Sequence, residues 1–481
     1  MPRLRLYELA LLAVILALSA AQFYYWDARF TDNELAVGGK GYVSDEVWYV
    51  ASARNIMLKV FHLSPREVGG YGYTIIYNST LDRARVESLA KEYGVTLRLD
   101  YSKLNGFYAH STNLTALNEF LDAVKRVVGV GDVIPGWMMP DASGINTYLN
   151  LEHPPLGKYV IGLTMVLVGD HPLYWRLGNM VAGVLLIFLT FLATRRLLQG
   201  NTVAGLAAAA LLSVDPLVRS LSSIALLDVY VSLFTALSFY LALGKRYGLA
   251  LLAAVIGALF KFNALFALIP LSLLYARERV KKRFNLLDFT ATLLGFYIVS
   301  GLAFLATQIL ASLPLISYLG FTNWFKQSIT GAIAWHTQVK CSGNGCPVSS
   351  APWDWFAGVN PFTLYYFPGG AAVVAVGFWP VWSFALVSTL VLLPGYLKGK
   401  TAFAKSSCWL LGLLAGYVLL WAVGGRTQYS FYAVQFAPVV YTSAIVIVAT
   451  FNSSNVLQVL RSWRDFLTEA ERAVGRLLLL Q

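Results

Sequence analysis

Charged residues are scarce in this chain: they make up 13% of its 481 residues, whereas an ordinary soluble domain carries about 25%. Hydrophobic residues make up 57%. This composition excludes an ordinary soluble fold and favours an integral membrane protein. The formal net charge is +12, but no nucleic-acid-binding motif accompanies it. The basic residues are therefore expected to report orientation in the membrane, with no nucleic-acid partner.

Cysteine is scarce as well, with three residues in the chain. Cys341 and Cys346 lie five positions apart in a polar loop rich in Gly, Ser and Pro. A disulfide between them would fit an oxidising, extracytoplasmic side, and two free thiols are the alternative. Cys408 sits in an apolar run, where it is expected to pack.

Apolar segments, in contrast, are plentiful. Those long enough to cross a bilayer lie near 7–24, 174–194, 202–216, 226–243, 248–261, 262–276, 287–312, 371–396, 406–424 and 430–450. We therefore expect an all-α polytopic membrane protein with about 10–11 transmembrane helices. Arg3 and Arg5 before the first run would also fit a signal peptide, but an uncleaved first span is favoured.

With the amino terminus inside, every alternate connection is basic, as the positive-inside rule requires. These connections contain Arg195 and Arg196, Lys245 and Arg246, the run Arg277 to Arg283, and Lys398, Lys400 and Lys405. The pattern of the tail 451–481 indicates an amphipathic helix on the inner leaflet or a solvated helix, so both termini are expected to be cytoplasmic. Two long connections, 25–173 and 313–370, then lie outside, and each must carry structure or function.

The first outer connection contains a segment with mixed strand and helix patterns. Gly72 to Tyr77, Val95 to Tyr101 and Gly106 to Ser111 resemble strands, and Leu81 to Tyr93 and Leu114 to Val128 resemble helices. This order predicts a small α+β extracytoplasmic insert over 70–135, with a partial ferredoxin-like sandwich. The chain then divides into a first transmembrane helix (1–24), a juxtamembrane segment (25–69), the insert (70–135), a second juxtamembrane segment (136–173), a transmembrane bundle (174–312), a second outer loop (313–370), C-terminal transmembrane helices (371–450) and the tail (451–481).

Two motifs at the outer helix ends carry chemistry. Ser44 precedes the adjacent carboxylates Asp45 and Glu46 and can cap a helix, although such acids often serve only as helix-start charges. The segment from Glu152 to Lys158 places an acid, an imidazole and an ammonium around two prolines before an apolar helix. Alone, it could be an ordinary proline-started helix.

Together these motifs resemble the protein O-mannosyltransferases of the glycosyltransferase C superfamily. The resemblance continues through Trp175-Arg176-Leu177, Ile224 to Asp228, Leu259 to Phe262, Trp335-His336 and Ser349 to Trp355. Phe356 replaces the family's usual proline, the insert at 70–135 is foreign to the pattern, and there is no room for the large soluble MIR domain of the eukaryotic members. These departures put acceptor choice in doubt.

The resemblance implies transfer of mannose, with inversion, from dolichyl or another polyprenyl phosphate to an acceptor hydroxyl, that of Ser or Thr in a protein. Asp45 would be the general base and Glu46 would orient the acceptor or the base. Candidates for binding the donor phosphate are Arg176, Lys158, Lys261 and Arg426, with snorkelling of the cations to water as the alternative. No cofactor is required, although Asp45, Glu46 and His153 leave a divalent metal open.

The remaining candidates would support the substrate pocket. Asp228 would place Arg176 by pairing with it, and Glu152 and His153 would shape the donor pocket. His336, Trp353 and Trp355 belong to the second outer loop, where the tryptophans would stack on sugar or peptide, or else anchor the loop in the headgroups.

Other classes of protein fit less well. A related transferase acting on a lipid-linked glycan or a lipid would use the same donor machinery. An oligosaccharyltransferase should carry a Trp-Trp-Asp motif, which is missing, and a transporter should hold its charges near the midplane and often shows inverted repeats.

If the insert were the binding module and the membrane part its scaffold, deleting 70–135 would abolish function. We expect turnover of a small soluble acceptor to survive that deletion. Pairing of two chains into a dimer stays open.

Overall fold

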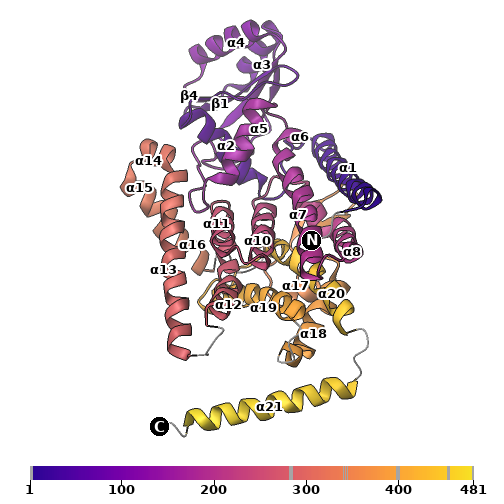
Figure 1. The fold of residues 1–481 in the computed structure, drawn as a ribbon. Coiled ribbons are helices and arrows are strands. Elements are labelled where there is room, and N and C mark those ends of the chain that lie inside the picture. Colours follow the sequence, from indigo (N-terminus) through magenta and orange to yellow (C-terminus); the bar gives the residue numbers. More distant parts are fainter. Residues whose placement is uncertain are drawn as a thin grey trace.

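The chain folds into a helical bundle with a small sheet-containing insert at one end, as the computed structural model shows (Figure 1). The structure describes residues 4–280, 285–339, 341, 343, 345–396, 401–451 and 456–478. Helix α21 (Val456–Leu478) lies across the end of the bundle opposite the insert.

Helices of the bundle match most of the apolar segments expected to span. They are α1 (Leu6–Ala36), α5 (Leu156–Leu167), α6 (Pro172–Trp175), α7 (Leu177–Leu197), α8 (Thr202–Ser213), α9 (Pro216–Ser222), α10 (Asp228–Leu243), α11 (Tyr247–Ala258), η1 (Phe262–Ala267), α12 (Leu268–Arg279), α13 (Leu286–Ala311), α18 (Trp379–Val391), η3 (Leu393–Tyr396), α19 (Thr401–Ala422), η4 (Ser430–Phe436) and α20 (Ala437–Phe451).

Within the described residues, five helical stretches are long and apolar enough to cross a membrane. A sixth is added if α8 and α9, bent by 66°, form one broken span, and α5, α10, α11 and α18 are shorter apolar helices. This architecture confirms the predicted class, a mostly helical polytopic membrane protein with small antiparallel sheets.

The expected span 371–396 is wrong at its start. Strand β5 (Thr363–Tyr366) pairs with β6 (Ala372–Val374) in a hairpin, and α18 begins only at Trp379. Gly369 and Gly370 form the turn with φ of 92° and 87°, a conformation that glycine adopts without strain. Of the basic residues expected on the inner connections, positions 281–283, Lys398 and Lys400 lie outside the described residues.

The insert is a four-stranded antiparallel sheet with two helices on one face. Its elements are β1 (Tyr71–Tyr77), α3 (Arg83–Glu92), β2 (Thr96–Arg98), β3 (Gly106–Ser111), α4 (Leu114–Val127) and β4 (Val130–Pro135), and the strand order is β2-β3-β1-β4. The sequence indicated every element except β4, which pairs with β1 and completes the ferredoxin-like order. Val86, Leu89 and Phe120 are buried between the helices and the sheet.

The insert shares a core with helix α2 (Glu46–Lys59), which follows the first span. Ile76, Tyr108 and Ile134 of its strands belong to one buried cluster with Ala51 of α2. Because these side chains leave water together, the insert and α2 stabilise each other.

An ion pair that is fully buried anchors the same helix from its other side. The guanidinium of Arg54 donates to both carboxylate oxygens of Asp170 at 2.8 Å, and Asp170 also accepts from the indole of Trp175 at 2.7 Å. A buried pair with further hydrogen bonds fixes a single geometry. Helix α2 is therefore held rigidly at the base of the insert.

The second outer connection is a run of short helices after α13. They are α14 (Leu313–Leu319), α15 (Phe321–Phe325), the π-helical turn η2 (Lys326–Gly331), α16 (Ala332–Thr337) and α17 (Asp354–Ala357). Phe321, Phe325, Ile333 and Trp335 are exposed apolar side chains of this segment. Such an apolar surface is suited to contact with lipid.

Candidate active site

The two adjacent carboxylates at the start of α2 face different environments. Ser44 has a left-handed φ of 54°, and Asp45, not Ser44, is the N-cap residue of α2, with a carboxylate that makes no capping hydrogen bond. Asp45 is partly exposed and lines a cavity, whereas Glu46 is fully buried. The acids that the sequence treated as a pair therefore have separate roles.

The cavity at Asp45 has a volume of about 760 Å³, within the usual range of ligand sites. Two carboxylates, Asp45 and Glu152, line it together with the ammonium of Lys326. Seven further side chains of the lining carry aromatic or imidazole rings. They are Trp48, Tyr49, Tyr148, His153, Trp335, Tyr429 and Tyr432. Charged groups of both signs and aromatic rings thus meet in one space, as in many ligand-binding pockets.

Glu46 is bound to Arg176 and not directed at the cavity. Its two carboxylate oxygens accept from Nε and one terminal nitrogen of Arg176 at 2.6 Å, and from the backbone amides of Val43 (2.8 Å) and Ala225 (2.6 Å). Arg176 also donates to the Asp27 carboxylate at 2.8 Å. A fully buried carboxylate with this many donors is a structural anchor, so the expected catalytic role of Glu46 is not supported.

Arg176 itself is fully buried, and its guanidinium is saturated by protein acceptors. Besides the carboxylates it donates to the hydroxyl of Thr31 and the carbonyl oxygen of Gly41. A phosphate could reach it only by displacing these partners. Binding of the donor phosphate by Arg176 stays a prediction; in this structure the arginine, with Glu46, ties α1, α2 and the α9–α10 turn together.

Two lysines expected at the phosphate are also engaged elsewhere. Lys261 pairs with Asp228 at 2.9 and 3.0 Å, so the predicted pairing of Asp228 with Arg176 is wrong. Lys158 is fully buried and donates to the carbonyl oxygens of Asn150 and His153. It fixes the turn that carries Glu152 and His153, and does not reach the cavity surface.

Lys261 nevertheless lies directly behind the cavity. Its ammonium is 4.1 Å from the centre of the Tyr432 ring, and Tyr432 lines the cavity. A cation over the ring face holds it in place. The Lys261–Asp228 pair therefore positions one wall of the site.

Glu152 and His153 are where the sequence predicted them, on the cavity wall. Glu152 accepts from the Tyr148 hydroxyl and from the Asn150 amide at 2.9 Å. Burial, with the Glu152 carboxylate beside it, raises the pKa of Tyr148, so the phenol stays protonated and donates. The imidazole of His336 lies 5.3 Å from that of His153, although it is not among the lining side chains.

The two tryptophans of the second outer loop lie in different environments. Trp355 is buried, donates to the Ser350 hydroxyl at 2.7 Å and packs on Tyr417, so the expectation that it stacks on substrate is wrong. Trp353 is 46% exposed and lies edge-to-face with Trp421 at 5.2 Å. Arg426 is exposed over the same Trp421 ring, at 5.2 Å.

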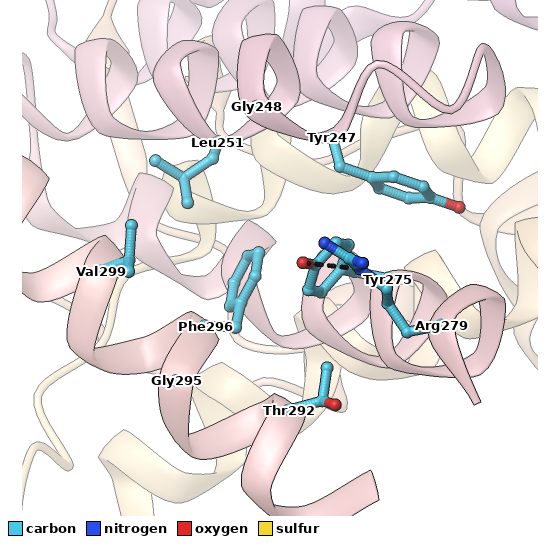
Figure 2. A pocket seen from close by; sticks show the side chains of 9 residues that line it. All are labelled: Tyr247, Gly248, Leu251, Tyr275, Arg279, Thr292, Gly295, Phe296 and Val299. Carbon is cyan, nitrogen blue, oxygen red and sulfur yellow. Dashed lines mark hydrogen bonds between the residues drawn. The ribbon is translucent and has the colours of Figure 1, made fainter. Parts of the chain in front are cut away.

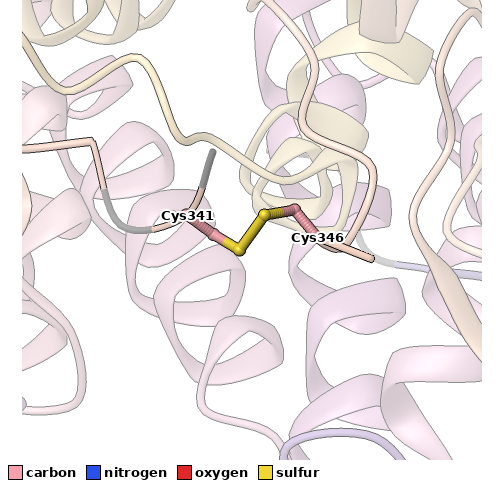
Figure 3. The surroundings of a disulfide bond; sticks show 2 residues. All are labelled: Cys341 and Cys346. Atoms are coloured by element: carbon pink, nitrogen blue, oxygen red, sulfur yellow. A yellow bond between two sulfur atoms is a disulfide. The ribbon is translucent and has the colours of Figure 1, made fainter. Parts of the chain in front are cut away.

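Cys341 and Cys346 form the predicted disulfide (Figure 3), with Cα atoms 5.7 Å apart. Cys341 and Pro347 belong to the cavity lining, so this bridge lies at the edge of the site. Cys408 is partly buried beside Pro270, as expected for packing.

Sequence reasoning missed the cation that the cavity actually contains. Lys326 lies on the π-helical turn η2, and π-helical turns often mark functional sites. It also missed Tyr429 and Tyr432, whose only signal was the aromatic run after Arg426. Partial burial, and next the Asp45 carboxylate, raises the pKa of Tyr429.

The described residues contain no group of three or more His, Cys, Asp or Glu that could hold a metal ion. Glu46, one of the three ligands considered from the sequence, is committed to Arg176.

Comparison with known proteins finds similarity to one family over part of the chain. The model of the dolichyl-phosphate-mannose-protein mannosyltransferases matches residues 152–302. A polyprenol-phosphate-mannose–protein mannosyltransferase of Mycolicibacterium smegmatis is 30% identical over 138 residues, which are 27% of this chain and 27% of that relative. The protein of the same name in Corynebacterium glutamicum is 24% identical over 397 residues, covering 64% of this chain and 72% of its own length.

Two solved structures are similar in part. ArnT of Cupriavidus metallidurans bound to undecaprenyl phosphate is 16% identical with a TM-score of 0.39, over 68% of this chain and 54% of that one. The Archaeoglobus fulgidus oligosaccharyltransferase is 13% identical with a TM-score of 0.37, over 64% and 44%. At these TM-scores the likeness carries no inference. The sequence matches therefore show a partial similarity to the dolichyl-phosphate-mannose-protein mannosyltransferases, the family that the motifs resemble.

Proposed function

We propose that this chain transfers mannose from a polyprenyl phosphate donor to a hydroxyl group, of Ser or Thr in a protein, with inversion at the anomeric carbon. The observation that carries the proposal is the cavity in which Asp45, Glu152 and Lys326 meet among aromatic side chains. The names of the Mycolicibacterium and Corynebacterium relatives supply the donor and the acceptor class.

Asp45 is the general base of this reaction. An acceptor hydroxyl attacks the anomeric carbon while the Asp45 carboxylate takes its proton, and the bond from that carbon to the phosphate oxygen breaks. Its electron pair leaves with the polyprenyl phosphate. One displacement of this kind inverts the anomeric centre, and a positioned base contributes about 10²–10⁴-fold to such a step.

Lys326 neutralises the donor phosphate as the bond breaks. An ammonium placed where negative charge develops stabilises the transition state. The exposed apolar side chains of α15 and α16, Phe325 and Trp335 among them, would contact the isoprenoid chain of the donor. The donor phosphate would then lie at the level of the cavity while its tail stays in lipid.

The orientation that suits this chemistry is the one the basic connections predict. The cavity and the insert would face the outer side, and both termini the cytoplasm. Labelling of single cysteines placed in the insert and in α21 of intact cells, with an impermeant maleimide, tests it: only the insert position should react.

Transfer by Asp45→Asn tests the proposal as a whole. With radiolabelled polyprenyl phosphate mannose and a peptide rich in Ser and Thr, we expect product formation to fall by about 10²–10⁴-fold, the usual contribution of a general base. Asp465→Asn, on the exposed face of α21, is the matched control and should transfer normally. Full transfer by Asp45→Asn would remove Asp45 as the base, and no transfer by the unaltered chain would contradict the activity.

A second acceptor class follows from the foreign insert, because the same donor site could serve a lipid or a lipid-linked glycan. Mass spectrometry of proteins and lipids from cells lacking the chain separates the two. Loss of O-linked hexose from proteins supports the proposal, and loss confined to lipids contradicts its acceptor.

A further inference from the structure

A second cavity, of about 520 Å³, lies among α11, α12 and α13, away from the Asp45 site (Figure 2). It borders α13 at Thr292, Gly295, Phe296 and Val299, near the beginning of that helix. Helix α13 is about 40 Å long at 1.5 Å per residue and leads to α14–α16 at its other end. The Asp45 cavity is lined instead by Lys326, Gly331 and Trp335, which follow the other end of α13 in the sequence. No described residue lines both cavities, so the second has no part in the proposed transfer.

The walls of this cavity are apolar along most of their length. Leu251, Phe296 and Val299 line it, and a Cβ atom placed at Gly248 or Gly295 would meet no other heavy atom within 4 Å. Glycines thus leave a groove between α11 and α13 where larger residues would fill it. Helix α13 is among the least buried spans of the bundle, with 17% of its apolar window buried, so the groove opens where lipid surrounds the protein.

One end of the groove is cationic. Figure 2 shows Arg279 beside Tyr275: its Nε donates to the Tyr275 hydroxyl at 3.1 Å, and its guanidinium carbon lies 5.5 Å from the centre of that ring. In the part of the chain that the structure describes, no carboxylate forms an ion pair with Arg279, whereas the nearby Glu278 pairs with Lys245 at 2.6 Å. The terminal nitrogens of Arg279 are thus not neutralised by a carboxylate.

Most of the surrounding charges are positive. Lys245 and Arg246 begin the connection to α11, and Arg277 lies two residues before Arg279 on α12. Glu278, paired as above, and Asp288, one turn before Thr292 on α13, are the acids of these elements. Basic residues between helices at a membrane surface bind anionic lipid headgroups, each contributing about 1 kcal/mol.

We propose that this groove binds an anionic phospholipid of the leaflet opposite the Asp45 site. The lipid phosphate would accept hydrogen bonds from Arg279, and one acyl chain would lie between α11 and α13 over Gly248 and Gly295. An apolar slot ended by a guanidinium without a carboxylate partner matches both parts of such a molecule.

Binding is tested on the purified full-length chain in a neutral detergent. We expect phosphatidylglycerol to raise the melting temperature and to stay bound in native mass spectrometry, and phosphatidylcholine and inorganic phosphate to do neither. Arg279→Gln should weaken phosphatidylglycerol binding by about fivefold, the loss of one basic contact. Arg461→Gln, an exposed charge on α21, is the control and should bind as the unaltered chain does.

The groove itself is tested by Gly295→Leu, which fills it. The melting temperature without lipid should not fall, because a Cβ atom at this position meets no other heavy atom within 4 Å and the rest of the side chain can enter the cavity, while phosphatidylglycerol should no longer be retained. Equal stabilisation by phosphatidylcholine would show that only the apolar slot binds, and stabilisation by inorganic phosphate alone would show a free anion site. Preference for a polyprenyl phosphate would make the occupant the lipid carrier. Each of these results overturns the proposal.

Discussion

Asp45 and Glu46 show how a single step along the chain changes the role of a carboxylate. Neighbouring residues of a helix point about 100° apart, since there are 3.6 residues per turn. Asp45 therefore lines the cavity while Glu46 meets Arg176 inside the protein. The sequence indicated that both acids matter but could not assign the direction of each, because that depends on where Arg176 arrives from 130 positions away.

Glu46→Gln should destabilise the fold before it affects chemistry. It leaves Arg176 with less compensating charge, and breaking a buried ion pair from one side costs about 3–5 kcal/mol. We expect a large drop in the melting temperature and in the yield of monodisperse protein, whereas Asp45→Asn should keep both. A Glu46→Gln chain that melts normally but transfers no sugar would instead give Glu46 a direct part in catalysis.

Glu67, in the connection from α2 to the insert, should make stability depend on pH. Partial burial, with the Asp170 carboxylate nearby, raises its pKa from 4.5 to about 7. An acid whose pKa is raised on folding stabilises the folded state only while it is protonated, so stability should fall as pH rises from about 4.5 to 7.

Glu67→Gln should remove this dependence. Because the carboxylate is partly exposed, the gain at pH 8 is about 1 kcal/mol at most, and no gain is expected at pH 4. Melting curves of both chains across that range provide the measurement. A variant that is less stable than the parent at pH 8 would show that the Glu67 carboxylate is favourable when charged.

At the scale of elements, hydropathy identified most helices because the signal is local to each segment. The strand β4 and the π-helical turn η2 were missed, since one depends on pairing with β1 and the other on packing beside the cavity. Ion pairs between distant elements, such as Arg54 with Asp170 and Lys261 with Asp228, were also beyond a single sequence. Hydropathy patterns predicted which segments span the membrane, but not which helices pack against each other.

Lys326 on η2 allows the clearest test at this scale. If its ammonium binds the donor phosphate, Lys326→Gln should raise the KM for polyprenyl phosphate mannose by about tenfold, which corresponds to about 1.4 kcal/mol. The KM for the acceptor should stay the same. Lys91→Gln, exposed on the insert helix α3, serves as the control, and an unchanged donor KM in Lys326→Gln would exclude the contact.

For the whole molecule, the insert is built into the membrane part and is not an attached module. Its strands share a core with α2, and the Thr74 hydroxyl oxygen accepts from the backbone amide of Met139 at 3.1 Å. The same helix α2 presents Asp45 to the cavity. Sequence reasoning expected a chain without residues 70–135 to keep turnover of a small acceptor, but these contacts argue against it.

Deletion of residues 70–135, with a short linker joining Gly69 to Gly136, should therefore lower the melting temperature and abolish transfer to every acceptor, because it exposes the face of α2 around Ala51.

A change confined to the outer face of the insert should act differently. Reversing the charge of the exposed Glu119 and Asp122 on α4 should leave the melting temperature and the rate with a short peptide unchanged, while altering the order of preference among folded protein acceptors. The two variants together separate support of α2 from acceptor selection. Full activity of the deleted chain with a short peptide would show that α2 holds Asp45 in place without the insert.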